Sequence, residues 1–380
     1  MSSKEKKFDI SYISVDSIQE GVGSSQIIPL VTALAKQGKK ISLTTFEKFS
    51  PPESLSTQLS AAGIHWNILE YGGNGAFNGF FRLLKIVTST PSANIIHARS
   101  DIPAVGAILS RSSRLILWDI RSLWADQRAI VNSKGWNFLT TWVARQLEAI
   151  AANHSSAIST LTYAVVPVLE RRYRRLPSIR EIIPTCVQTD KFILTPLPAT
   201  KLTCLLSGTF NNFYDLERMA LVISEIRKLT PLRVIWARPN ESTSVVLGVG
   251  EDLTVTASYE EMPSIVSASH FGIASCKDIN PETLTAVAPT KVAEFLASGR
   301  PMLVSQGIGD LDLLLEENRV GVSIRPSGDL VEDLLRFISL VRDKDVSTRC
   351  RKVSEENFSM ETAIQKYVSI YDKMKESIKS

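Results

Sequence analysis

The segment APTKVAEFLASGRPMLVSQGIGD, residues 288–310, places a lysine and a glutamate at the start of a predicted helix. Pro289 and Thr290 favour a helix N-terminus, whose unpaired amides and positive dipole end suit an anion such as a diphosphate. Lys291 lies in the first turn, where the dipole disfavours a positive charge, so its presence suggests an anionic ligand. Glu294 follows three residues later, about one turn along the same face, and a surface ion pair with Lys291 is the structural alternative.

The same segment continues into a short strand and a second glycine-rich turn. Gly299 is typical of the residue that ends a helix, and Pro301 prevents the helix from continuing. After an apolar strand, QGIGD (306–310) opens another helix. We expect the backbone N–H groups from Gly307 to Gly309 to be free to contact a ligand.

Short apolar runs alternate with amphipathic helical stretches along most of the chain, which positions these residues in an α/β fold. Strands are predicted at 8–15, 40–46, 65–71, 94–98, 114–120, 156–161, 203–209, 232–237, 253–257, 271–275, 301–305 and 320–324. Helices are predicted at 24–38, 135–154, 215–229, 260–269, 289–298 and 328–343. Strands separated by helices of this length call for parallel βαβ units, so we predict two Rossmann-like, doubly wound domains that face each other across a cleft.

The predicted domains are residues 1–183 and 184–356, followed by a C-terminal helix, 357–380, that could cross back to the first domain. The seam falls in the proline-rich segment 181–201, which shows little periodicity and reads as a linker. Ligands of doubly wound sheets bind outside the carboxyl ends of the strands, which places the site in the cleft.

Composition excludes several classes of protein. The chain has 380 residues, 44% of them hydrophobic and 22% charged, and its net charge of +4 gives no case for nucleic-acid binding. The four cysteines are far apart and form no metal motif, so we expect reduced thiols in a cytoplasmic protein and no bound metal. The N-terminus lacks the apolar stretch of a signal peptide, and no run is long enough to span a membrane.

Five motifs, in order along nearly the whole chain, resemble the GT-B glycosyltransferases, in particular the retaining class known as family 4. They are EGVGSSQIIPLVTALAKQGKKISL (20–43), LWDIRSLW (117–124), IIPTCVQTDKF (182–192), TCLLSGTFNNFYDLERM (203–219) and the segment 288–310. The resemblance implies a nucleotide-sugar donor, bound as a substrate on the C-terminal domain, and an acceptor on the N-terminal domain. It requires no further cofactor.

The resemblance also implies roles for particular residues. Glu294 would accept hydrogen bonds from the ribose, and the catalytic set would be Lys291, Arg238 and Arg121. The remaining donor-binding candidates are Thr290, Gly208, Glu282, Gly307 and Gly309. The acceptor-side or cleft candidates are Gly21, Gly23, Arg99, Asp101 and Asp119.

The sequence departs from the family pattern in two places. The family pairs two glutamates, and where the first would stand this chain has Ala286, although Glu282 or Asp278 could replace it. Many relatives also place cations after the first donor-domain strands, whereas SGTFNNFYD has none and Arg238 is the nearest candidate. A donor other than a common UDP- or GDP-hexose is therefore an open alternative.

Structural readings compete with the functional ones on the N-terminal side. Asp119 and Arg121 could form a salt bridge, Arg99 and Asp101 could form a buried pair, and Gly21 with Gly23 could serve only a tight turn.

Two other segments allow contact with a membrane. The five arginines of LERRYRRLPSIR (169–180) could be a solvated face or could contact anionic head groups. The stretch 75–87, read as a loop, contains Phe77, Phe80 and Phe81, which could help that contact or lie buried in the core.

We therefore predict a metal-independent glycosyltransferase, cytoplasmic or peripheral on the inner face of the membrane, acting on a glycan or lipid-linked acceptor. The resemblance suggests a bacterial surface polysaccharide pathway. The alternatives are a sugar-nucleotide epimerase and a non-catalytic relative that binds nucleotide or glycan.

Overall fold

The computed structural model describes residues 7–19, 21, 23–131, 137–198, 201–210, 213–238, 247–277 and 280–378. The chain divides into two compact domains. The N-terminal domain comprises Met1–Ile183 together with Ala363–Ser380, and the C-terminal domain comprises Pro184–Thr362.

The N-terminal domain is built on a parallel sheet in the order β3-β2-β1-β4-β5-β6-β7. Its strands are β1 (Phe8–Ile13), β2 (Ile41–Glu47), β3 (Ile64–Glu70), β4 (Ala93–Arg99), β5 (Leu115–Asp119), β6 (Ala157–Thr160) and β7 (Ile179–Ile182). The central strands are buried on both faces, which explains why they read as continuous apolar runs in the sequence.

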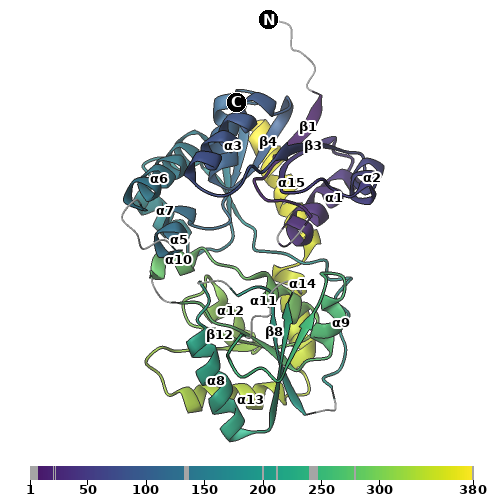
Figure 1. The fold of residues 1–380 in the computed structure, drawn as a ribbon, viewed down its shortest axis with the longest axis vertical. Coiled ribbons are helices and arrows are strands. Elements are labelled where there is room, and N and C mark those ends of the chain that lie inside the picture. Colours follow the sequence, from purple (N-terminus) through teal and green to yellow (C-terminus); the bar gives the residue numbers. More distant parts are fainter. Residues whose placement is uncertain are drawn as a thin grey trace, which may run out of the picture. The chain divides into compact units, whose positions relative to one another are not determined.

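Helices cover both faces of this sheet (Figure 1). They are the π-helical turn η1 (Gly23–Ile27), α1 (Ile28–Lys36), α2 (Glu53–Ala61), α3 (Ala76–Ser89), α4 (Asp101–Ser110), α5 (Trp124–Val131), α6 (Asn137–His154) and α7 (Val166–Arg172). Strands β2 and β3 lie in turn on one side of β1, and strands β4 to β7 lie in turn on its other side. Because such crossovers are right-handed, the reversal puts α1 and α2 on one face and α4, α6 and α7 on the other.

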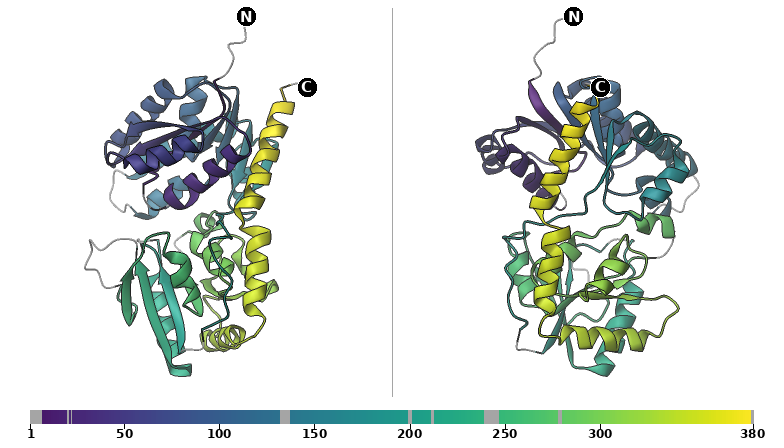
Figure 2. Two further views of the ribbon diagram at one scale, coloured as in Figure 1. Left: turned by 90° about the vertical axis from the view of Figure 1, so that its right-hand side faces the viewer. Right: turned by 180° about the vertical axis from the view of Figure 1, so that it is seen from behind.

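Helix α15 (Met360–Glu376) packs on the N-terminal sheet from Ala363 onward, and it is the yellow helix of Figure 2. Tyr367 and Tyr371 lie against His97 of β4, with ring centroids 4.9 and 6.1 Å away. The chain end is thereby anchored to the centre of the sheet.

The C-terminal domain has a second parallel sheet, in the order β10-β9-β8-β11-β12-β13. Its strands are β8 (Leu202–Ser207), β9 (Leu232–Arg238), β10 (Leu253–Thr256), β11 (Phe271–Ala274), β12 (Met302–Ser305) and β13 (Gly321–Ile324). Its helices are α8 (Leu216–Leu229), α9 (Met262–Ser267), α10 (Pro281–Thr285), α11 (Thr290–Ala297), α12 (Leu311–Glu317), α13 (Leu330–Val341) and α14 (Val346–Asn357). One apolar core includes α8 and α13, and the other includes α11 and α14.

Arg300, which follows α11, ties the segment before β8 to the C-terminal domain. Its side chain is fully buried, and it donates hydrogen bonds to the carbonyls of Thr195, Pro196 and Ser267 and to the Thr195 hydroxyl. The predicted linker is thus an integral part of this domain.

The predicted α/β class with two doubly wound domains is confirmed, and every predicted strand is present. Two local predictions were wrong. Strand β7 was not predicted, because its sequence IREI is short and half polar. Residues 75–87 were read as a loop, whereas α3 occupies 76–89, because the flanking glycines masked the helical period.

Candidate functional site

The candidate residues of the C-terminal domain gather at the carboxyl edge of its sheet. Strands β8, β9, β11 and β12 end there. Arg238 is the last residue of β9, and the segments after β8, β11 and β12 carry Gly208, Glu282 and Gly307. Helix α11 begins at the same edge with Pro289 as its N-cap residue, as predicted.

Lys291 in the first turn of α11 is buried against aromatic rings. It is 8% exposed, and its Nζ has no hydrogen-bond partner within the described residues. The Nζ instead lies 4.2 Å from the ring centroid of Phe210 and 4.4 Å from that of Tyr214. Two cation–π contacts replace the carboxylate that a buried ammonium ordinarily has. Burial lowers the pKa of Lys291 to about 8.

Glu294 lies one turn along α11 and is also 8% exposed. Burial raises its pKa to about 7, against the opposing effect of Lys291. The alternative of a solvated surface ion pair is therefore wrong, since both residues are buried. Burial raises the pKa of Tyr259 and Glu294 raises it further, and the Tyr259 hydroxyl is buried and lacks a partner within the described part of the chain.

The aromatic residues around Lys291 connect three of the predicted positions. Trp236 donates from Nε1 to the carbonyl of Gly208 (3.1 Å) and lies under the guanidinium of Arg238 (5.7 Å). Phe210 sits between Trp236 and Lys291, with its ring centroid 6.5 Å from that of Trp236.

Sequence reasoning missed this aromatic contribution. The available signal was SGTFNNFYD itself, where rings stand in place of the expected cations.

The second glycine-rich turn does not offer the amides that we expected. The Gly307 N–H donates to the Asp312 carboxylate (2.9 Å), and the Gly309 N–H donates to the carbonyl of Leu284 (2.9 Å). The expectation that these N–H groups are free was therefore wrong. Gly307 has a φ of +89° and Gly309 a φ of +52°, so the turn itself accounts for both glycines.

Glu282 and Ala286 lie on or beside the short helix α10. Glu282 is in its first turn and partly exposed, whereas Ala286 ends the helix and is 2% exposed. A glutamate in place of Ala286 would have to enter a packed interior. The proposed stand-in Asp278 lies outside the described residues.

On the N-terminal domain, Asp119 at the end of β5 is the centre of a buried charged cluster. Its carboxylate lies 3.5 Å from Arg121 Nη1, 3.9 Å from Arg99 Nη1 and 3.4 Å from His97 Nε2, and it accepts a hydrogen bond from Ser159 (2.9 Å). Burial alone would raise the pKa of Asp119, but Arg121, His97 and Arg99 together hold it below its usual range.

The salt-bridge reading of Asp119 with Arg121 is thus confirmed. The functional readings of both residues stay predictions.

Arg99 and Asp101 do not form the buried pair that we considered. Arg99 turns to Asp16, whose carboxylate lies 3.3 Å from its Nε, and to Asp119. Asp101 accepts a hydrogen bond from Trp118 Nε1 (3.1 Å), and burial raises its pKa well above the usual value. Arg99 is therefore connected to a partly exposed acid, whereas Asp101 lies in the interior.

Gly21 and Gly23 allow the backbone conformation and the close approach that the turn after β1 requires. Gly21 has a φ of +53°, and a Cβ on Gly23 would lie 1.9 Å from the carbonyl oxygen of Ser17. The tight-turn reading accounts for both residues, and a ligand contact stays a prediction.

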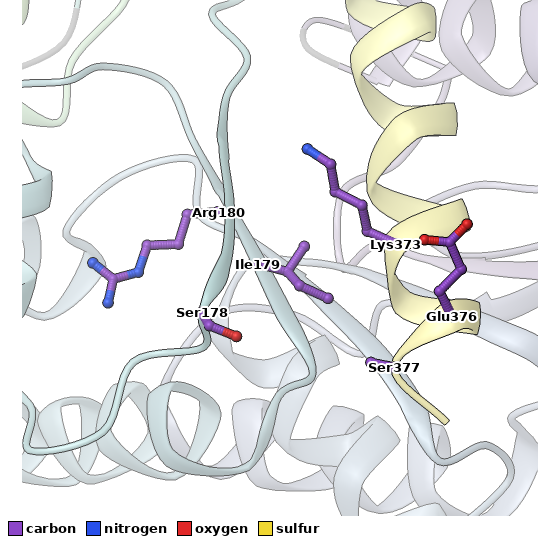
Figure 3. Close-up of a pocket in the computed structure, with 6 residues that line it drawn as sticks. All are labelled: Ser178, Ile179, Arg180, Lys373, Glu376 and Ser377. Atoms are coloured by element: carbon purple, nitrogen blue, oxygen red, sulfur yellow. The ribbon is translucent and has the colours of Figure 1, made fainter. Parts of the chain in front are cut away.

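A shallow pocket in the N-terminal domain lies elsewhere (Figure 3). It is lined by Ser178, Ile179, Arg180, Lys373, Glu376 and Ser377. These residues are at the start of β7 and the end of α15, opposite the carboxyl ends of the strands, and no predicted site residue lines it.

No protein-family model matches the sequence, and no curated protein matches it significantly. Solved structures do match the fold. A sucrose-phosphate synthase from Thermosynechococcus elongatus is 13% identical, with a TM-score of 0.74 over 98% of this chain and 100% of that one. HepE from Anabaena, solved in complex with UDP and glucose, is 12% identical, with a TM-score of 0.66 over 98% and 100% of the two chains.

WaaG, a glycosyltransferase involved in lipopolysaccharide biosynthesis, is 11% identical, with a TM-score of 0.61 over 93% of this chain and 98% of that one. These likenesses span both domains and nearly the whole of each chain. The chain therefore has the GT-B fold that its motifs predicted.

Proposed function

We propose that this protein is a glycosyltransferase that moves a sugar from a nucleotide-sugar donor to a glycan or lipid-linked acceptor. The observation that carries the proposal is the buried ammonium of Lys291 at the N-terminus of α11, which has no hydrogen-bonding partner among the residues that the structure describes. An amide-rich helix end and an unpaired cation together form a site for a phosphate group. The GT-B fold and its glycosyltransferase neighbours support the assignment.

In this proposal the C-terminal domain stabilises the departing nucleotide. When the bond between the sugar and the phosphate breaks, negative charge develops on the phosphate oxygens. The Lys291 ammonium and the amides of the first turn of α11 would stabilise that charge, with Arg238 as a second cation at the end of β9. Glu294 would accept hydrogen bonds from the ribose hydroxyls. These groups perform the step without a resident metal ion.

The similar solved structures suggest which donors to test first. HepE was solved with UDP and glucose, so a UDP-sugar is the first donor to test. The rings of Phe210 and Tyr214 stand where other members of the class carry cations. A donor with fewer phosphate charges than a nucleoside diphosphate sugar is therefore included in the test.

WaaG belongs to lipopolysaccharide synthesis, and we propose a similar setting, polysaccharide or glycolipid assembly at the inner face of a membrane. The four cysteines, all within the described residues, are buried and form no disulfide with one another, which agrees with a reducing compartment.

The experiment is thermal unfolding with UDP, GDP, ADP, CMP and their sugar conjugates, followed by a product assay with the stabilising donor. A nucleotide present at ~100 times its Kd adds about 2.7 kcal/mol to the free energy of unfolding. We expect one nucleotide to stabilise the wild type and Lys344→Ala, an exposed control, but not Lys291→Ala. Stabilisation of Lys291→Ala to the same degree would refute the site. Nucleotide binding without transfer to any acceptor would leave a binding protein instead of an enzyme.

A further inference from the structure

Helix α3 turns an apolar stripe to the solvent. Phe77, Phe80, Phe81 and Leu84 recur at the spacing of one helix face and are 73%, 55%, 43% and 42% exposed. A surface helix of a globular domain normally packs such a stripe into the core. The outward stripe is therefore a feature that the folding of this domain does not explain.

Arg82 fixes this orientation. It lies on the inner side of α3, is buried, and donates from Nη1 to the carbonyls of Tyr71 (3.0 Å) and Gly73 (2.7 Å). Its guanidinium also lies 4.4 Å from the ring centroid of Tyr71. A rotation of α3 that buried the phenylalanines would expose these carbonyls and break the contact, so the stripe is held outward.

Helix α6 presents a second stripe of the same kind. Phe138, Leu139, Trp142 and Val143 are 83%, 54%, 52% and 43% exposed. Both α3 and α6 pack against α4, so the two helices belong to the same helical layer of the N-terminal domain (Figure 1). Together these eight residues define what we call the aromatic surface.

The exposed charged side chains that α3 and α6 themselves carry are basic. Helix α3 contains no Asp or Glu, and the one acid of α6, Glu148, is 2% exposed. Lys85 and Arg145 are 39% and 47% exposed. Lys85 lies 3.8 Å from Glu70 of β3, which is 83% exposed, whereas the acid next to Arg145, Asp126, is buried. Beyond α7, Tyr173 donates a hydrogen bond to Glu148 (2.6 Å), which brings the exposed arginines 174 and 175 next to α6.

We propose that the aromatic surface docks the protein on an anionic lipid bilayer. Aromatic side chains favour the boundary between head groups and acyl chains, and cations at its rim are attracted to anionic head groups. Within the described residues, no helix is both long enough and apolar enough to span a bilayer, so the contact is interfacial. The inference extends the proposed function, since a docked N-terminal domain would meet a lipid-linked acceptor.

The test is flotation of the full chain with vesicles of phosphatidylcholine, with or without phosphatidylglycerol. We expect binding to the anionic vesicles, weakened by added salt. Burying one exposed aromatic side chain in the bilayer interface contributes favourable free energy of binding. Phe77→Ser, and separately Trp142→Ser, should therefore weaken partitioning onto the vesicles about tenfold. Leu313→Ser, at a leucine of the C-terminal domain that is 70% exposed, is the matched control and should bind as the wild type does. All these side chains are exposed, so thermal unfolding should be unchanged.

Absence of vesicle binding, or binding that Phe77→Ser and Trp142→Ser leave intact, would overturn the proposal. Self-association that is lost in the same variants would also overturn it, since the surface would then bind a second copy. The experiment uses no nucleotide, so its failure is distinct from failure of the donor site. Conversely, Lys291→Ala should float with anionic vesicles even though it no longer binds nucleotide.

Discussion

Replacing Lys291 with methionine should make the ligand-free protein more stable while abolishing nucleotide binding. Burial lowers the pKa of this lysine from 10.5 to about 8, and each pH unit corresponds to about 1.4 kcal/mol. Keeping the charged form in the folded protein at pH 7 therefore costs roughly 3 kcal/mol. Contacts with the rings of Phe210 and Tyr214 offset about 1–2 kcal/mol of this cost. Methionine fills a similar volume and packs well against aromatic rings.

The expected gain in the free energy of unfolding is therefore about 1–2 kcal/mol at pH 7. Urea unfolding monitored by circular dichroism measures it, with Lys344→Met as a control at an exposed lysine. The two domains can unfold in separate transitions. The free energies of the wild type and the variant are therefore compared for the transition whose midpoint the Lys291 substitution shifts.

The dependence on pH provides the sharper test. Between about pH 8 and 10.5 the unfolded chain holds a proton on Lys291 that the folded protein lacks, so wild-type stability rises with pH there. The advantage of Lys291→Met should shrink over this window by about 1.4 kcal/mol per pH unit. A destabilised variant at pH 7, or an advantage that stays constant from pH 7 to 10, would show that Lys291 is not held as an unpaired buried charge.

Three further predictions concern other buried charges. Burial raises the pKa of Glu294 from 4.5 to about 7. The folded protein therefore holds a proton that the unfolded chain lacks between these pH values, and its free energy of unfolding should fall as the pH rises from 4.5 to 7. Urea titrations at several pH values should show that Glu294→Gln lacks this fall. Asp119→Asn should lower the free energy of unfolding by about 3–5 kcal/mol, because Arg99 and Arg121 lose their buried counter-charge, and a change below 1 kcal/mol would contradict this. Arg300→Ala should cost about 3 kcal/mol by leaving the linker carbonyls unpaired, whereas Arg300→Lys should recover only part of it.

The strands and the start of α11 could be predicted because their signals are local. Parallel strands that are buried on both faces read as apolar runs, and Pro289 with Gly299 bounds a helix by backbone geometry alone. The partners of Lys291 could not be predicted in the same way. Phe210 and Tyr214 come from a loop about 80 residues earlier in the chain, and only the parallel pairing of β8 with β11 brings that loop to α11.

The orientation of α3 shows a different limit. The spacing of Phe77, Phe80, Phe81 and Leu84 indicates one helix face, but hydrophobic periodicity does not say whether that face meets the core or the solvent. The direction depends on Arg82, whose carbonyl partners lie in the loop before the helix. Phenylalanine is usually buried and arginine usually exposed, and Phe81 and Arg82 reverse this rule. A sequence-based prediction therefore leaves both orientations of the helix open.

The free-energy cost of burying the charge of Lys291 also bears on whether the chain still binds a phosphate-bearing ligand. Ala286 shows that one glutamate of the family pattern is absent, and this alone is compatible with a site that has lost its ligand. Within the described residues Lys291 Nζ has no hydrogen-bond acceptor, and its two cation–π contacts offset only part of the cost of burying its charge. A buried lysine that is expected to destabilise the free protein favours a ligand that supplies the missing negative charge. The buried charge therefore favours our proposal that the α11 site binds an anion over the alternative that it is a remnant.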